Sequence, residues 1–293
     1  MVFFSVMAGF TVRAQELIIP QMSTKQSITQ DLGAGQITLT YSRPNVNYRK
    51  IFGSVQPYGI VWRTGDNAAT TIKLTNEVTI ADKKIPAGEY VLFSIPGEKE
   101  WTFILNKTPK QWSAYNYKDG DILQWDAYDY KANRNTIRFT VPAIKTAKFT
   151  ETLTMQFTDA VDTSCSLQMN WENTEVVVNM KTDDDKLVME NIAKAMDSEQ
   201  RPYYMAAVYY YNHNKNIAKA LHWITIQDKV QPNACNVKYW KACIQLKTGD
   251  KENAIATATE GLKLAQKNNN TEYIRLNQEV LSKAQENSAM SSL

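Results

Sequence analysis

Histidine is almost absent from the sequence. Of 293 residues only His213 and His222 are histidines, and both lie in the last third of the chain. The N-terminal part therefore lacks the side chain that most often serves as a general base near neutral pH or as a zinc ligand. There is also no G-x-S-x-G elbow, P-loop, dinucleotide-binding fingerprint or H-E-x-x-H motif. We predict no metal and no cofactor, and binding is favoured over catalysis.

Cysteine is scarce as well. The chain has three cysteines, so they cannot all pair with one another. Cys235 and Cys243 lie in a helical region, and along one helix their spacing corresponds to about 12 Å, too far for a disulfide. Cys165 shares the alternation of Leu167 and Met169, which predicts an inert thiol in the core. No disulfide scaffold is expected.

Long apolar runs and a strong charge imbalance are also missing. The net charge of +3 gives no indication of nucleic-acid binding, and no stretch approaches the roughly 18 apolar residues of a membrane span. The short apolar stretch Val2 to Val12 precedes small or apolar residues at Val12-Arg13-Ala14. We predict that residues 1–14 are the remnant of a secretory signal and that the protein is periplasmic or extracellular. The alternative is an apolar first strand.

Residues 15–181 alternate between apolar and polar side chains with the two-residue period of β-strands. Turn-forming sequences such as Gly33-Ala34-Gly35 and Pro86-Ala87-Gly88 separate many of these segments. Short strands at this spacing without intervening helices predict an antiparallel, jelly-roll-like β-sandwich, with a barrel as the alternative. The segments that alternate most clearly are Ile37/Leu39/Tyr41, Ile72/Leu74, Val78/Ile80, Ile137/Phe139/Val141, Leu153/Met155/Phe157, Leu167/Met169/Trp171 and Val176/Val178/Met180.

Residues 182–293 have helical spacing instead. The acidic run Asp183-Asp184-Asp185 suits the N-terminus of a helix that begins near Lys186. Ala220 and Ala254 are 34 residues apart, which is the tetratricopeptide period. We predict two degenerate tetratricopeptide-like repeats with flanking helices in an all-α domain, and a plain helical bundle is the alternative.

The densest group of candidate ligand-binding residues lies between Tyr41 and Thr75. Arg63 follows an apolar segment and precedes the turn Thr64-Gly65-Asp66-Asn67. A guanidinium group binds carboxylates or phosphates through a rigid fork, and we expect the neighbouring arginines at the same end of the sandwich. The alternative is that these arginines only pair with surface acids. The predicted ligand-binding residues are Arg43, Arg49, Tyr58, Trp62, Arg63, Thr64, Asp66 and Asn67.

Carboxylates and aromatic residues form two further candidate groups. Two acids facing one cleft would suit glycoside hydrolysis, although acids in loops are usually solvated; the candidates are Glu77, Glu89, Asp119, Asp121, Asp126 and Asp129. Aromatic residues in a polar segment would suit a sugar or peptide surface, or a loop that covers a sheet edge. These aromatic residues are Trp112, Tyr115, Tyr117, Trp125, Tyr128 and Tyr130, whereas Trp101 is expected in the core.

Several short motifs occur in one order along the β region. They are Ser42-Arg43-Pro44, Ile51-Phe52-Gly53, Pro57-Tyr58-Gly59, the segment Trp62 to Asn67, Ile85-Pro86-Ala87-Gly88 and Trp101-Thr102. Together they resemble a family of secreted bacterial proteins known as domain of unknown function 2911, over roughly residues 27 to 180. The resemblance implies a β-rich secreted domain and transfers no catalytic residues. Asp66 departs from it, because the family pattern has a smaller residue such as alanine there.

The sequence as a whole predicts an exported binding protein. The sandwich is expected to hold a small anionic or carbohydrate ligand, and the helices are expected to dock a protein or peptide. Two alternatives are a carboxylate-dependent hydrolase acting on a glycan and a structural envelope component that has no cleft.

Overall fold

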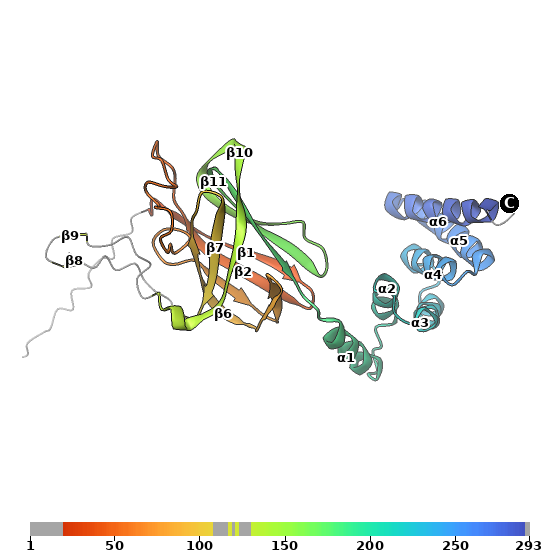
Figure 1. The fold of residues 1–293 in the computed structure, drawn as a ribbon. Helices are drawn as coiled ribbons and strands as arrows, with labels where there is room; N and C mark the ends of the chain where they lie inside the picture. The colour runs from red at the N-terminus through yellow and green to blue at the C-terminus, as the bar shows by residue number, and fades with distance from the viewer. Residues whose placement is uncertain (1–19, 108–116, 119–120, 123–129, 291–293) are drawn as a thin grey trace, which may run out of the picture. The chain divides into compact units, whose positions relative to one another are not determined.

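The computed structural model describes residues 20–107, 117–118, 121–122 and 130–290. The predicted signal remnant lies outside the described residues, as do Trp112, Tyr115, Asp119, Trp125, Asp126, Tyr128 and Asp129. The chain divides into two compact units, residues 1–184 and residues 185–293. The predicted order of a β domain followed by an all-α domain is confirmed (Figure 1). Among the described residues, no helix is long and apolar enough to cross a membrane.

The β domain is built on a nine-stranded antiparallel sheet with the order β1-β2-β3-β6-β7-β10-β11-β4-β5. In the long strand β10 (Asn135–Thr158), residues 135–142 pair with β7 and residues 143–158 pair with β11, so this strand passes from one layer to the other. The strands are β1 (Thr24–Leu32), β2 (Gly35–Arg43), β3 (Thr71–Leu74), β4 (Val78–Ile80), β5 (Lys83–Ile85), β6 (Gly88–Ile95), β7 (Glu100–Asn106), β10 (Asn135–Thr158) and β11 (Ser164–Lys181), with β8 (Tyr117–Lys118) and β9 (Asp121–Ile122) forming a separate pair.

Two strands are much longer than the sequence pattern indicates. The segments around Ile137 and Leu153 belong to the single 24-residue strand β10. The segments around Leu167 and Val176 likewise belong to the 18-residue strand β11. The pairing register shifts near Thr150, and Glu172 has a φ of 51° in the middle of β11. Such irregularities bend a strand without ending it, so the polar stretches between the apolar segments are bends and not breaks.

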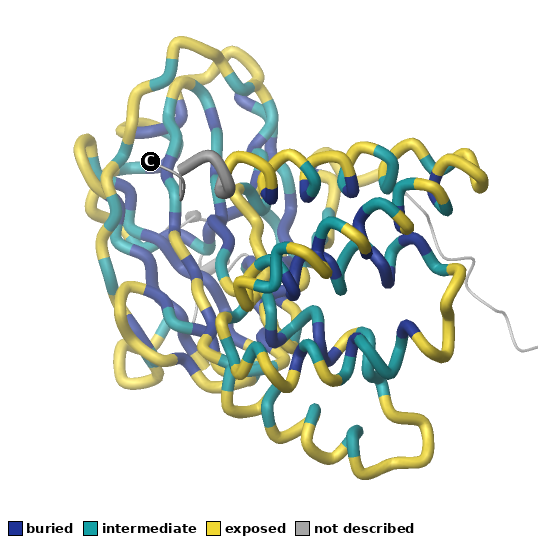
Figure 2. The backbone as a smooth tube through the Cα atoms, turned by 90° about the vertical axis from the view of Figure 1, so that its right-hand side faces the viewer, coloured by how far each residue is buried: buried dark blue, intermediate teal, exposed yellow. Residues whose placement is uncertain are grey.

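The larger apolar cluster of the β domain lies between the two layers (Figure 2). The hydroxyl of Tyr41 in β2 accepts a hydrogen bond from the backbone nitrogen of Met155 in β10 at 2.8 Å, which ties the layers together. Trp62 stacks on Trp171 with ring centroids 5.8 Å apart. Phe52 packs edge-on against Trp101 at 4.8 Å and against Trp171 at 5.8 Å. Aromatic pairs of this geometry add stability beyond the area that they bury.

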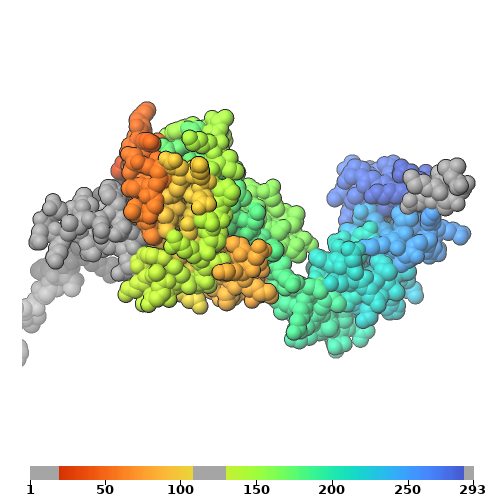
Figure 3. All heavy atoms as spheres, in the orientation of Figure 1, coloured from red at the N-terminus to blue at the C-terminus, as the bar shows by residue number. Residues whose placement is uncertain are grey.

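The connection between β2 and β3 supplies part of this core. Residues 44–70 have little regular structure, yet they contribute the buried side chains of Val46, Ile51, Phe52 and Trp62. The backbone of Trp62 pairs with Ser94 of β6, so the connection packs against the sheet beside β6 and β7 (Figure 3). This segment is therefore part of the folded domain and not a free loop.

Residues 185–290 of the C-terminal unit form six helices. They are α1 (Asp185–Met196), α2 (Tyr203–Asn212), α3 (Ile217–Val230), α4 (Cys235–Lys247), α5 (Lys251–Lys267) and α6 (Thr271–Met290). Each helix from α2 onward packs on the next one in sequence, and α4 also packs on α2 and α6. Ala220 of α3 and Ala254 of α5 are both fully buried at equivalent places in successive helix pairs. This arrangement is consistent with the tetratricopeptide-like prediction, and all three cysteines are free, as expected.

A buried group of charges joins three of these helices. The ammonium of Lys238 in α4 lies 2.9 Å from Asp228 in α3 and 2.9 Å from Glu260 in α5. The side chain of Lys238 is only 7% exposed, and Lys241 lies 2.7 Å from the second oxygen of Asp228. Burial alone would raise the pKa of Asp228, but Lys241 and Lys238 hold that pKa below its usual range.

Replacing Asp228 with asparagine is expected to destabilise the helical unit by about 3 kcal/mol, because the buried ammonium of Lys238 keeps only the exposed Glu260 as a partner and Lys241 loses its ion pair. The lowered pKa means that the carboxylate stabilises the fold above about pH 4 and loses that effect as the pH falls through the folded pKa. The acid-induced loss of stability should therefore be smaller in Asp228→Asn than in the wild type. Urea unfolding followed by far-UV circular dichroism at several pH values measures both effects.

The exposed pair of Arg275 and Glu279 on α6 provides a matched control. Glu279→Gln should change the unfolding free energy by less than about 0.5 kcal/mol, since exposed ion pairs contribute little. Equal losses in the two variants would show that the buried group has no special role.

Candidate functional site

Arg63 and Asp66 form an ion pair at the surface of the β domain. The guanidinium of Arg63 donates to Asp66 at 3.1 Å. The hydroxyl of Ser23 donates to the other oxygen of Asp66 at 2.6 Å, and the amide of Asn67 donates to the Ser23 carbonyl at 3.2 Å. Burial would raise the pKa of Asp66, but Ser23, the Asn67 backbone and Arg63 together hold it below its usual range. These contacts fasten the turn to the residues just before β1.

Trp62 and Thr64 are buried beneath this turn. The indole nitrogen of Trp62 donates to the carbonyl of Gly65 at 2.9 Å. Thr64 is fully buried with a φ of 54°, and its hydroxyl lies 2.9 Å from that of Ser94. The hydroxyl of Thr70 donates to the Thr64 carbonyl at 2.7 Å. A strained residue that is hydrogen-bonded to Ser94 and Thr70 holds the turn in one conformation.

The three other predicted residues lie elsewhere. Arg49 donates to two backbone carbonyls of its own turn, Val46 at 2.9 Å and Asn45 at 2.7 Å. Arg43 lines one cavity and Tyr58 lines another, whereas the Arg63–Asp66 pair lines neither. Neither of these two cavities gathers the eight predicted residues.

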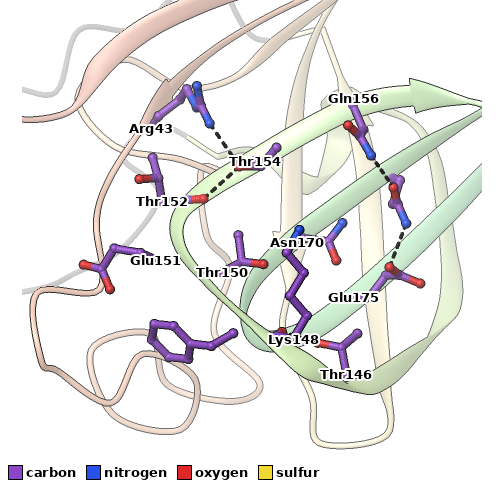
Figure 4. A pocket seen from close by; sticks show the side chains of 12 residues that line it. Arg43, Thr146, Lys148, Thr150, Glu151, Thr152, Thr154, Gln156, Asn170 and Glu175 are labelled. Atoms are coloured by element: carbon purple, nitrogen blue, oxygen red, sulfur yellow. Dashed lines mark hydrogen bonds between the residues drawn. The ribbon is translucent and has the colours of Figure 1, made fainter.

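The cavity that contains Arg43 lies on the β10–β11 hairpin, and we call it the hairpin cavity (Figure 4). Its volume of about 630 Å³ falls within the range of small-molecule sites, roughly 300–1,000 Å³. Almost all of the side chains that line it are polar. The lining residues are Arg43, Thr146, Lys148, Phe149, Thr150, Glu151, Thr152, Thr154, Gln156, Gln168, Asn170 and Glu175.

Strand alternation creates this polar lining. Every second residue of β10 from residue 146 to residue 156 lines the cavity, together with Phe149 and Glu151, whereas Leu153 and Met155 are buried in the core. Successive side chains of a strand point to opposite faces, so the pattern that fills the core also builds the cavity. We call the outward set the threonine face: Thr146, Lys148, Thr150, Thr152, Thr154 and Gln156.

Hydrogen bonds hold several of these side chains in place. Arg43 donates to the Leu153 carbonyl at 3.1 Å and to the Thr154 hydroxyl at 3.0 Å. On the opposite side, Gln156 donates to Gln168 at 2.6 Å, and Gln168 donates to Glu175 at 2.7 Å (Figure 4). A ligand would therefore meet donors and acceptors whose positions are set before it binds.

The rim of the hairpin cavity carries an aromatic side chain and a second carboxylate. Phe149 is 51% exposed. The carboxylate of Glu151 accepts from the backbone nitrogen of Asn47 at 2.8 Å, and the Glu151 carbonyl accepts from Val46 at 2.8 Å. The adjoining Tyr48 is fully exposed at a left-handed turn position. An apolar ring thus lies next to a polar lining.

Of the six predicted acids, Glu77 pairs with Lys84 at 2.9 Å, and neither Glu77 nor Glu89 lines a cavity described here. Each cavity instead holds two carboxylates from outside the predicted six: Glu151 and Glu175 in the hairpin cavity, and Glu98 and Glu172 in the cavity that Tyr58 lines. Thr150, Thr152, Thr154 and Gln156 are polar at every second position of the sequence. This pattern could have indicated a polar surface opposite a buried face. Within the described residues, no three His, Cys, Asp or Glu side chains are grouped to hold a metal ion.

These contacts predict different roles for Thr64 and Arg63. Thr64→Val should destabilise the β domain by about 1–3 kcal/mol, because it leaves a buried hydroxyl and the strained turn without their hydrogen bond. Arg63→Ala should cost no more than about 1 kcal/mol, since its ion pair is partly exposed. Chemical denaturation followed by tryptophan fluorescence separates the two variants, and a larger loss in Arg63→Ala would contradict this assignment.

The family relationship rests on the β domain. The model of the family described as proteins of unknown function, DUF2911, matches residues 23–180, which is more than half of the chain. Neither the curated proteins nor the solved structures gave a match. The motifs quoted above lie within the matched region, and the chain belongs to the DUF2911 family of proteins of unknown function.

Proposed function

We propose that the β domain binds a carbohydrate in the hairpin cavity. One observation supports this proposal above the others: the threonine face and the exposed ring of Phe149 border the same cavity. A sugar presents hydroxyl groups that donate and accept hydrogen bonds, together with apolar C–H faces that pack on aromatic rings. The cavity offers a partner for each of these features.

The polar groups also favour a neutral ligand at this place. Hydroxyls and amides, which both donate and accept, make up most of the lining. The charged groups are two cations, Arg43 and Lys148, and two carboxylates, Glu151 and Glu175, so their formal charges cancel. Among the predicted ligand-binding residues, Arg43 alone belongs to this proposed site.

Removing the aromatic ring tests the proposal. Phe149→Ala should weaken binding of neutral oligosaccharides about fivefold or more, because a stacked ring contributes roughly 1 kcal/mol or more. A panel of neutral glycan fragments screened by isothermal titration calorimetry against the full-length protein identifies a ligand and measures its affinity.

Ile144 provides a matched control for this measurement. It belongs to the same strand, is also 51% exposed, and lines neither cavity. Ile144→Ala should bind the glycan as the wild type does. Equal weakening in both variants, or the absence of binding across the panel, would contradict the proposal and leave a structural envelope role as the better account.

A glycan hydrolase is the second candidate, because Glu151 and Glu175 border the same cavity. Hydrolysis would require one of them to protonate the leaving oxygen while the other acts as base or nucleophile. Incubation of the bound oligosaccharide with the protein distinguishes the two cases. Product formation that is lost in both Glu151→Gln and Glu175→Gln would assign catalysis, and an intact oligosaccharide would leave binding.

For the helical unit we propose export together with the β domain and binding of a protein or peptide. Support comes from a row of half-buried aromatic residues across α2, α4 and α6. The ring centroids of Tyr211 and Trp240 lie 5.6 Å apart, and those of Tyr239 and Tyr273 lie 5.9 Å apart. Aromatic residues are enriched where protein surfaces meet.

An amine-reactive cross-linker that does not pass the inner membrane tests both parts in intact native cells. The expected products join lysines of the helical unit to an exported protein. Reaction that requires lysed cells would contradict export, and products confined to lysines of the β domain would contradict docking at the helices.

A further inference from the structure

A second cavity borders the β10–β11 hairpin at residues 143–145 and 172–174, and we call it the lysine cavity. Its volume is about 760 Å³. Four separate stretches of the chain meet there: residues 50–58, residues 98–99, residues 143–145 of β10 and residues 172–174 of β11. Its lining residues are Lys50, Phe52, Tyr58, Glu98, Lys99, Ala143, Lys145, Glu172, Asn173 and Thr174.

The lysine cavity and the hairpin cavity are lined by different residues. Ala143 and Lys145 occupy odd-numbered positions of β10 and line the lysine cavity, whereas the threonine face occupies even-numbered positions. No residue lines both cavities. A substitution in one cavity therefore leaves the lining side chains of the other cavity in place.

The cations of this cavity are unpaired within the part of the chain that the structure describes. Lys50, Lys99 and Lys145 come from three different segments, and no ion pair joins any of them to a described carboxylate. Three ammonium groups around one cavity repel one another, and a bound anion would relieve that repulsion.

The acids of the cavity do not cancel this charge. Both oxygens of Glu172 already accept backbone hydrogen bonds, from Ile51 at 2.8 Å and from Phe52 at 3.1 Å. Glu172 thus fastens the residues around Phe52 to β11. Counting Glu98 and Glu172 against Lys50, Lys99 and Lys145 still gives the cavity a net formal charge of +1.

Tyr58 completes the lining as a positioned hydrogen-bond donor. Its ring packs on Gly53, where an added Cβ atom would lie 2.7 Å from the ring carbon Cε2. Gly53 also has a φ of 79°, a conformation that glycine adopts without strain. Burial raises the pKa of Tyr58, and Glu98 and Glu172 raise it further, so the phenol keeps its proton and can donate at neutral pH.

We propose that the lysine cavity binds a small ligand through a phosphate or carboxylate group, held by Lys50, Lys99 and Lys145 with the Tyr58 hydroxyl. Both groups are oxyanions that accept hydrogen bonds from ammonium and phenol donors. Thr174 and Asn173 supply further polar atoms at the same place. This site is separate from the carbohydrate site proposed above.

Isothermal titration calorimetry of the full-length protein with inorganic phosphate and with citrate, at low ionic strength, tests the proposal. Binding is expected for at least one of the two, and it should weaken as salt is added. The double variant Lys99→Gln/Lys145→Gln should lower the affinity about tenfold or more, as expected when two charge-assisted contacts are lost. Binding of phosphate alone or of citrate alone would identify the group that the cavity selects.

The double variant Lys73→Gln/Lys83→Gln is the matched control. Both lysines are exposed in the β domain and line neither cavity, so the control removes the same net charge elsewhere. Equal weakening in the two double variants would reduce the effect to bulk charge and overturn the proposal, as would no binding of either anion. Neutral glycans and Phe149→Ala report on the other cavity, so the two proposals fail independently.

Discussion

The two-residue period of β10 is the constraint on which the rest of the β domain depends. Leu153 and Met155 fill the core, and Thr152, Thr154 and Gln156 between and beside them face outward. A slip of one residue in the pairing with β11 would exchange the two faces and place polar side chains in the core. Fold and candidate site are therefore specified by the same strand, and the bend near Thr150 is accommodated without ending it.

The connection from residue 44 to residue 70 depends on the core that β10 and β11 enclose. Phe52 and Trp62 enter that core, and Glu172 of β11 holds the backbone of Ile51 and Phe52. The motif residues gathered in this connection thus act largely as a scaffold. Two motif residues line cavities instead: Arg43 lines the hairpin cavity and Tyr58 lines the lysine cavity.

Much of the fold could be predicted because alternation and helical spacing are local signals. The apolar faces around Ile37, Ile72 and Met169 and the helix pairs around Ala220 and Ala254 all appear as expected. The candidate site could not be predicted as well, because it depends on distances between remote segments. Arg43 meets Thr154 across 111 residues of chain, and Arg63 pairs locally with Asp66. A dense cluster of arginines and aromatics in sequence therefore indicated a folded connection more than a shared pocket.

The most direct test of this account is amide chemical-shift mapping of the full-length deuterated protein with a neutral oligosaccharide. The account predicts that the perturbed amides lie in residues 146–156 of β10 and residues 168–175 of β11, with little change around Arg63 or in the helices. Perturbations centred on residues 62–67, or spread over the helical unit without the hairpin, would contradict it.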